Sequence, residues 1–293
     1  MPARPDSLRT VLQILLYVAL YYLAALTLGT VFQWLGVYLV GLTAPILLAA
    51  ALANWVSLRI HHGYRLRDAG LWWRRASAVN LALGLAGGVL AACLVLAPPL
   101  AVGAAHIRAT PGDPGSLTSV LYLAIVLATG AAGEELLFRG YGFQVLMGAV
   151  GPFAAILPVG IVFALLHGAN PHATAFGLAN TAGFGILFGY AYWRSGDLWL
   201  PIGLHFGWNL TLPLFGVNLS GLTMKVTGHA MTWSAGKLWS GGDYGPEASV
   251  LTSAALVALW VFVWKAPVCR QASPLAWPPA EDVLCEPSRP LAS

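Results

Sequence analysis

Charged side chains are scarce in this chain. Only 9% of its 293 residues are Asp, Glu, Lys or Arg, and 58% are hydrophobic. An average soluble domain carries about 25% charged residues. The 15 basic and 11 acidic residues cannot cover an ordinary water-facing surface, and their number excludes a nucleic-acid-binding domain, a disordered chain and a collagen-like repeat. The composition is instead typical of a polytopic membrane protein.

Cysteine and internal repetition are also scarce. The three cysteines, Cys93, Cys269 and Cys285, share no close spacing, so the sequence predicts neither a disulfide framework nor a zinc ribbon. No period of about 20–50 residues and no inverted duplication is visible, which argues against a solenoid and, more weakly, against many transporter folds.

Long apolar runs dominate what is present. A helix needs about 20 apolar residues to cross the hydrocarbon of a bilayer. The runs are continuously apolar rather than alternating, which favours helices over transmembrane strands. We therefore predict an all-α bundle of about eight transmembrane helices, at Val11–Thr30, Val37–Ser57, Val79–Val102, Leu117–Leu137, Pro152–Leu166, Ala173–Trp193, Leu198–Phe215 and Ser249–Trp264.

Basic residues predict the orientation of these spans. Five arginines crowd the loop after the second span, between Arg59 and Arg75, and such loops are typically cytoplasmic. Together with a composition that looks bacterial, this favours a multi-pass protein of the bacterial inner membrane. The predicted organisation is a cytoplasmic N-terminus (1–10), N-terminal spans with the basic loop (11–116), a polar core of spans (117–215), an external loop (216–248), a last span (249–265) and a proline-rich, disordered cytoplasmic tail (266–293).

Three charged residues interrupt the fourth predicted span. Between Asp113 and Arg194 the only charges are Glu134, Glu135 and Arg139, and a carboxylate at the bilayer centre costs about 2.5–3.5 kcal/mol on insertion scales. Glu135 and Arg139 are four residues apart and can pair on one helix face, whereas Glu134 points about 100° away. One paired and one free carboxylate suit general-base chemistry. The alternative is an interfacial salt bridge that only ends the span.

Two further segments carry polar groups within apolar runs. FALLHGANPHA places Phe163 and His167 four residues apart, with Asn170 shortly after, and PIGLHFGWN places His205 and Asn209 four apart. A lone buried histidine is more often a hydrogen-bonded core residue than a base. Here His205 and Asn209 share one helical face and can address the same substrate atom.

The topology sets one condition on such a site. Glu134 and His205 lie towards the cytoplasmic side, whereas His167 ends its span on the external side. The three side chains meet only if the fifth span starts deep in the membrane, or if Gly168–His172 breaks the helix inside a polar cavity, where irregular backbone is tolerated at membrane depth. We predict this break.

EELLFR, FALLH and HFGWN fit the patterns Glu-Glu-x-x-x-Arg, Phe-x-x-x-His and His-x-x-x-Asn. In this order, on hydrophobic helices, they resemble the CPBP family of intramembrane endopeptidases, which includes the CAAX prenyl proteases and bacterial relatives linked to bacteriocin self-immunity. The resemblance covers about Leu117–Phe215. One departure is that Pro171 stands where the CAAX proteases have an asparagine one turn after the second-motif histidine, with Asn170 one residue early. The substrate class is therefore left open.

The resemblance implies a role for each motif residue. Glu134 would act as general base for a water, assisted by His167, while Glu135 and Arg139 would order the site. His205 and Asn209 would stabilise the oxyanion of the tetrahedral intermediate. Phe163 and Asn170 would support the site. Amide hydrolysis needs an activated water on one side of the carbonyl and donors on the other, which agrees with this assignment.

The sequence also leads to predictions about cofactors, partners and alternative functions. We expect no cofactor and a glutamate-type mechanism; Glu134, His167 and His205 are the residues that would hold zinc, but no His-Glu-x-x-His motif is present. The expected partners are a peptide or protein substrate and membrane lipid, with no nucleic acid; the oligomeric state is left open. The alternatives are a catalytically silent scaffold or bacteriocin-immunity protein of the same fold, and a proton-coupled transporter.

Overall fold

The computed structural model describes residues 7–36, 38–112 and 114–275. Each of the eight predicted spans lies within or largely coincides with a helix, so the predicted all-α membrane bundle is confirmed. These helices are α1 (Ser7–Trp34), α2 (Tyr38–His62), α3 (Arg75–Ala101), α4 (Leu117–Arg139), α6 (Pro152–Leu166), α7 (Ala175–Ser195), α8 (Trp199–Leu214) and α10 (Val250–Lys265). Shorter elements connect them: α5 (Tyr141–Val150), α9 (Lys237–Ser240) and the 3₁₀ turns η1 (Leu66–Ala69), η2 (His167–Ala169), η3 (Gly242–Tyr244) and η4 (Pro246–Ala248).

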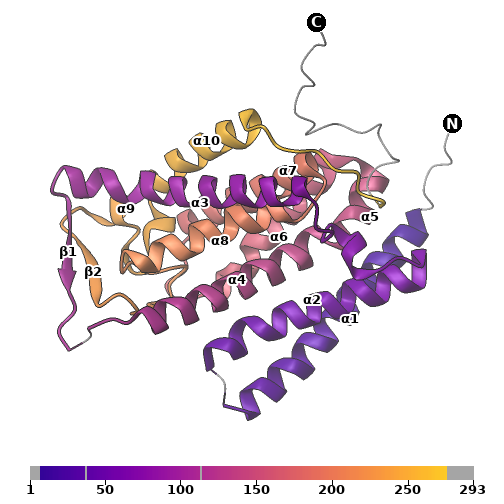
Figure 1. Cartoon of the computed structure of the whole chain (residues 1–293), viewed down its shortest axis with the longest axis horizontal. Coiled ribbons are helices and arrows are strands. Elements are labelled where there is room, and N and C mark those ends of the chain that lie inside the picture. Colours follow the sequence, from indigo (N-terminus) through magenta and orange to yellow (C-terminus); the bar gives the residue numbers. More distant parts are fainter. Residues whose placement is uncertain (1–6, 37, 113, 276–293) are drawn as a thin grey trace, which may run out of the picture.

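The helices differ in how well they suit a lipid environment. Among the described residues, five helical segments are long and apolar enough to cross a membrane, namely 7–34, 40–62, 75–101, 117–150 and 152–169. Helix α8 has only 16 residues, most of them buried, and it packs against α3, α4 and α7. In Figure 1, α3, α8 and α4 lie side by side, and α1 and α2 form a hairpin beside them. Helix α8 is therefore an interior helix surrounded by protein.

Small residues bring α3 and α8 into backbone contact. A Cβ atom added to Gly84 of α3 would lie 2.3 Å from the carbonyl oxygen of Leu200, and one added to Gly203 of α8 would lie 2.5 Å from that of Leu81. Side chains of any size would push these helices apart, and close approach through small residues is a common way to pack membrane helices. This packing fixes the height of α8 in the bundle.

The break between α4 and α5 is fixed by Asn54 of α2. Its Nδ2 donates to the carbonyl oxygen of Leu136 at 3.0 Å, and its Oδ1 accepts from the backbone N–H of Tyr141 at 2.7 Å. Gly140 stands at the break, where a Cβ atom would lie 2.1 Å from the Leu136 oxygen and 2.3 Å from Asn54 Oδ1. The buried asparagine thus satisfies the backbone groups that the helix end leaves unpaired.

A small sheet and an extended segment lie outside the helical prediction. Strand β1 (Ala105–Ala109) pairs antiparallel with β2 (His229–Trp233), which lies in the segment expected to be an external loop. At the other end of the bundle, residues 266–275 pack against α3, α5 and α7 through hydrogen bonds (Figure 1). The predicted tail therefore begins with a packed stretch, and its remainder, 276–293, lies outside the described residues, as do residues 1–6.

Candidate active site

Helix α4 places two adjacent carboxylates in different surroundings. Ser116 begins the helix by accepting the N–H of Ser119 at 3.0 Å, and the helix continues without interruption to Arg139. The side chain of Glu135 is fully buried, whereas that of Glu134 is about one quarter exposed and faces a cavity. The helical rotation between neighbours, about 100°, separates the two carboxylates as the sequence predicts.

Glu135 is held by two partners inside the bundle. Its Oε2 lies 3.1 Å from Nη1 of Arg139, which is also fully buried, and its Oε1 lies 2.9 Å from Nδ1 of His205. Arg139 also donates to the carbonyl oxygen of Gly185 at 2.6 Å and lies over the ring of Phe163 at 5.1 Å. A buried ion pair of this kind needs such additional partners to offset its desolvation.

The partners of the two histidines fix which nitrogen faces the cavity. Nδ1 of His167 lies 2.8 Å from the carbonyl oxygen of Phe163, which only accepts, so Nδ1 carries the proton. Nδ1 of His205 likewise donates to Glu135. Both Nε2 atoms are thereby turned towards Glu134, and the ring of His205 stacks on Phe188 with centroids 5.0 Å apart. A hydrogen bond at one ring nitrogen orients the other.

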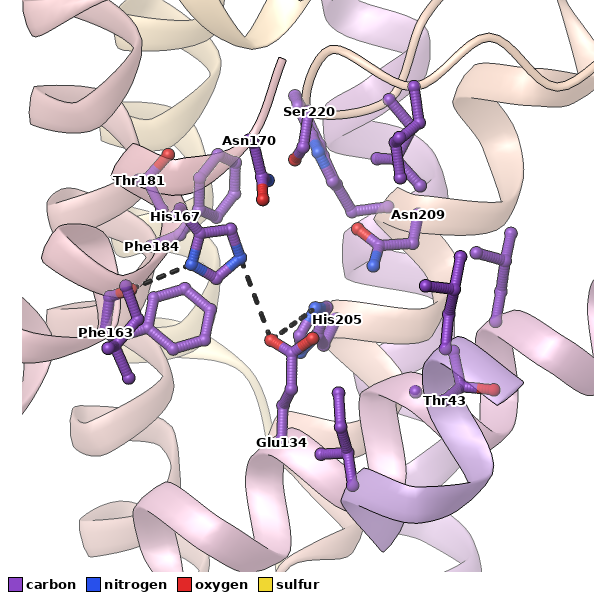
Figure 2. A pocket seen from close by; sticks show the side chains of 18 of the residues that line it. Thr43, Glu134, Phe163, His167, Asn170, Thr181, Phe184, His205, Asn209 and Ser220 are labelled. Atoms are coloured by element: carbon purple, nitrogen blue, oxygen red, sulfur yellow. Dashed lines mark hydrogen bonds and ion pairs between the residues drawn. The ribbon is translucent and has the colours of Figure 1, made fainter. Parts of the chain in front are cut away.

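Glu134 lies between the two imidazoles, as Figure 2 shows. Its Oε2 is 3.8 Å from Nε2 of His167 and 4.0 Å from Nε2 of His205. These separations exceed a direct hydrogen bond and suit groups that share one small polar molecule. Within the described part of the chain, Glu134 Oε2 is a buried atom with no hydrogen-bond partner, although it lies in the ion-pair range of both histidines. Such an atom in a native structure calls for an explanation.

A cavity of about 380 Å³ surrounds these groups. Asn170 and Asn209 also line it, and Figure 2 shows Asn170 near His167 and Asn209 near His205. The rest of the wall is largely apolar, with side chains from α1, α2, α4, α7 and α8. Charged groups interact more strongly in such a low-dielectric enclosure than in water.

The predicted break after α6 is present. Helix α6 ends at Leu166, a 3₁₀ turn follows over His167–Ala169, and Asn170 continues with extended backbone. His172 adopts a φ of 59°, and its side chain is not among those that line the cavity. The break lets His167 end its helix while its side chain still faces Glu134.

The structure brings together all eight residues selected from the sequence. Glu134, His167, His205, Asn170, Asn209 and Phe163 line the cavity, and Glu135 and Arg139 lie directly behind it. Sequence reasoning missed Glu247, a carboxylate from the turn η4 that lines the same cavity, and Ser220, which contacts it. Both lie in the segment expected to be a loop; the one signal was an isolated acidic residue just before an apolar helix.

The same side chains define the candidate ligands of a metal ion. Two histidines and a glutamate can leave one open position on zinc. Among residues 7–36, 38–112 and 114–275, however, no group of three or more His, Cys, Asp or Glu side chains has the arrangement of a metal site. Glu134 and the two Nε2 atoms converge, but at separations wider than the roughly 3.3 Å between ligands of a tetrahedral zinc with bonds of about 2.0 Å.

Comparison with known families agrees with the motifs. Residues 116–211 match the family model described as type II CAAX prenyl endopeptidase Rce1-like. The match begins at the residue that caps α4, ends two residues after Asn209 and contains all three motifs. No curated protein and no solved structure matches the chain. The segment that carries the site, residues 116–211, therefore matches the Rce1-like family model of the CPBP endopeptidases, the family that its three motifs resemble.

Proposed function

We propose that this protein is an integral-membrane endopeptidase of the inner membrane that hydrolyses a peptide bond of a membrane-associated protein or peptide. The observation that supports this most directly is the convergence of Glu134 Oε2 with the Nε2 atoms of His167 and His205 at 3.8 and 4.0 Å inside a largely apolar cavity. The family match also supports this proposal, because the matched family is one of CAAX-type peptidases.

The two histidines suit different roles because their partners differ. His167 donates from Nδ1 to a neutral carbonyl, which leaves an Nε2 lone pair to receive or relay a proton of the attacking water beside Glu134. His205 donates to the carboxylate of Glu135, which can balance an imidazolium. In that form its Nε2–H can donate to an oxyanion, together with the amide of Asn209 one turn further along α8.

The proposed reaction then proceeds in two steps. Glu134 accepts a proton from a water molecule, and the resulting hydroxide attacks the carbonyl carbon of the scissile peptide bond. His205 and Asn209 stabilise the negative charge on the carbonyl oxygen. The proton held by Glu134, or relayed through His167, passes to the leaving amine, the carbon–nitrogen bond breaks, and Glu134 returns to its ionised form.

The proposed mechanism requires no metal ion. The test is to measure zinc per chain in protein purified in detergent, and cleavage before and after chelation. We expect sub-stoichiometric zinc and cleavage that survives chelation. One zinc per chain that disappears in a His167→Ala/His205→Ala variant, with loss of cleavage on chelation, would replace this mechanism with a metal-assisted one.

The activity itself is tested by looking for new peptide termini. Membranes from cells that express the wild type, Glu134→Gln or the exposed control Asp243→Asn are compared by terminus-selective mass spectrometry. We expect a set of termini present with the wild type and Asp243→Asn and absent with Glu134→Gln. Hits are confirmed with purified protein in proteoliposomes. If the three samples give the same termini and the purified protein cleaves none of the candidate membrane peptides, the chain is a silent scaffold.

A further inference from the structure

A second carboxylate shares the cavity with Glu134. Glu247 lies in the turn η4, just before α10, and is only 8% exposed, yet its side chain belongs to the cavity wall. The proposed peptide hydrolysis does not use it. A buried carboxylate is expensive, so its place in the wall of a reaction cavity calls for a specific reason.

The turn opposite Glu247 is shaped to hold this carboxylate. The N–H and the hydroxyl of Ser220 both donate to Oε2, the hydroxyl at 2.8 Å, and the indole N–H of Trp208 donates to Oε1 at 3.2 Å. Ser220 has a φ of 48° and Gly221 one of 83°, at the tip of a tight turn between Leu219 and Leu222. A serine is uncommon in this left-handed region. The strained turn directs two donors at one oxygen.

The tip of this turn is fixed against its neighbours. The N–H of Gly221 donates to the carbonyl oxygen of Tyr244 at 2.7 Å, and a Cβ atom at Gly221 would lie 1.8 Å from the carbonyl oxygen of Pro171. Figure 2 shows Ser220 close to Asn170 in the view. The turn therefore forms a rigid wall that presents Glu247 to whatever occupies the cavity.

The charges that line the cavity are unbalanced. Its described wall contains two carboxylates, Glu134 and Glu247, and neither a lysine nor an arginine, and an imidazolium at His205, next to Glu134, would balance only one of the two. Glu135 and Arg139 neutralise each other behind the wall. No ion pair joins Glu247 to a basic side chain within the described ranges. Burial raises the pKa of the Glu247 carboxyl, and the hydrogen bonds from Ser220 and Trp208 oppose that rise. A cation next to Glu247 would offset the burial.

We propose that Glu247 forms a specificity subsite that takes a cationic group of the peptide substrate, either a lysine side chain or a free α-amino group. Leu219 and Leu222, on the same turn, and Met224, in the irregular segment after it, supply apolar wall for the aliphatic stem of such a group. A carboxylate of the substrate is disfavoured at this position because it would face Glu247. This inference rests on the proposed peptidase function.

The alternative is that Glu247 only anchors the turn. In that case its replacement lowers stability and the cleavage of every substrate by the same factor. The two explanations therefore differ in a ratio of rates, which does not depend on the fraction of protein that is folded.

The experiment uses a peptide that spans one of the Glu134-dependent cleavage sites, with purified full-length protein in proteoliposomes. The peptide is made with its lysine, with norleucine or glutamate in place of the lysine, and with a free or acetylated N-terminus. For the wild type we expect kcat/KM to be at least about tenfold higher for the cationic form than for its uncharged counterpart, and lower still for glutamate. A difference between the lysine and norleucine peptides identifies a lysine side chain as the bound cation, and a difference between the free and acetylated peptides identifies the α-amino group.

Two variants then test the residue. In Glu247→Gln the ratio of kcat/KM between the cationic and uncharged peptides should fall to about one. In Ser220→Ala, which removes one donor but keeps the carboxylate, the ratio should persist even if the absolute rates fall. An equal ratio in the wild type and Glu247→Gln, or no preference for cationic peptides in the wild type, overturns the subsite. If Glu247→Gln does not fold, the order of kcat/KM for the lysine, norleucine and glutamate peptides with the wild type decides whether the subsite exists.

The outcome is separable from that of the peptidase proposal. If no Glu134-dependent termini exist, the peptidase function fails. If such termini exist and neither a basic residue nor a free N-terminus lies within about four residues of the cleaved bonds, the peptidase function stands and the subsite is wrong.

Discussion

Two of the buried polar clusters in the described part of this apolar chain differ in how completely their hydrogen-bonding groups are paired. One is the cavity around Glu134. The other surrounds Asp197, in the turn between α7 and α8, where Asn80 Nδ2 donates at 2.9 Å, Trp199 N–H donates at 3.1 Å and Gln271 donates as well. Both Asp197 carboxylate oxygens thus have protein donors, whereas Glu134 Oε2 has none in the described chain.

The difference separates a structural role from a chemical one. Asp197 caps the first turn of α8, because it accepts from the N–H groups of Trp199 and Leu200, and through Asn80 and Gln271 it ties α3 and the C-terminal segment 266–275 to that helix. Because Asp197 does not line the cavity, folding alone explains this cluster. An unpartnered carboxylate oxygen facing two imidazoles destabilises the folded state, and it is explained by what the cavity does.

The largest expected effect comes from removing the unpartnered charge. Glu134→Gln keeps the shape of the side chain but cannot accept a proton, so we expect the rate of peptide cleavage to fall about 10³–10⁴-fold. The free energy of unfolding in detergent should change by less than about 0.5 kcal/mol, because no protein donor is lost. Cleavage assays and thermal unfolding of the same preparations measure both. Substantial residual cleavage would assign the general base to another group and remove the contrast between the clusters.

The next largest effect is expected from removing Glu135, the paired carboxylate next to Glu134. Glu135→Ala leaves the buried guanidinium of Arg139 without its anion, which should lower the free energy of unfolding by about 3–5 kcal/mol. It also removes the hydrogen bond that orients His205, so cleavage falls too. In the double variant Glu135→Leu/Arg139→Met much of the stability should return without cleavage. If Glu135→Ala is as stable as the wild type, the buried ion pair between Glu135 and Arg139 does not stabilise the fold.

The sequence predicts the features whose signals are local. Apolar runs mark the eight helices, and the four-residue spacings in the three motifs place each polar pair on one helix face. Isolated charges in an apolar run show where to look for chemistry, which is how Glu134, Glu135 and Arg139 stand out.

Features that depend on distant partners could not be predicted. The pairing of β1 with β2 joins segments more than 100 residues apart, and neither strand is distinctive alone. Asn54 lies on α2 but forms the hydrogen bonds at the end of α4. Glu247 becomes part of the cavity only because the turn at Ser220 folds over it. Asp197 and residues 266–275 belong to the same class, since a proline-rich stretch looks disordered until Asn80 and Asp197 supply its hydrogen bonds. The membrane orientation stays a prediction.

The smallest expected effect concerns the satisfied cluster and its dependence on pH. Burial raises the pKa of Asp197 from 3.8 to about 6, against the opposing hydrogen bonds from Asn80, Leu200, Ser195 and Trp199. Between these two values the folded protein holds one proton more than the unfolded chain. The free energy of unfolding therefore falls as the pH rises through this window, by about 3 kcal/mol at most, and levels off above about pH 6.

Asp197→Asn should remove this contribution, so that its stability varies less between pH 4 and pH 6.5 than that of the wild type, while the exposed control Asp243→Asn keeps the wild-type slope. Thermal unfolding in detergent across this range measures the slopes, and cleavage at pH 7 by the folded fraction should stay within about threefold of the wild type, because Asp197 does not line the cavity. If Asp197→Asn instead stops cleavage without changing stability or its pH dependence, the turn between α7 and α8 acts on the chemistry. A fully satisfied cluster would then be no sign of a purely structural role.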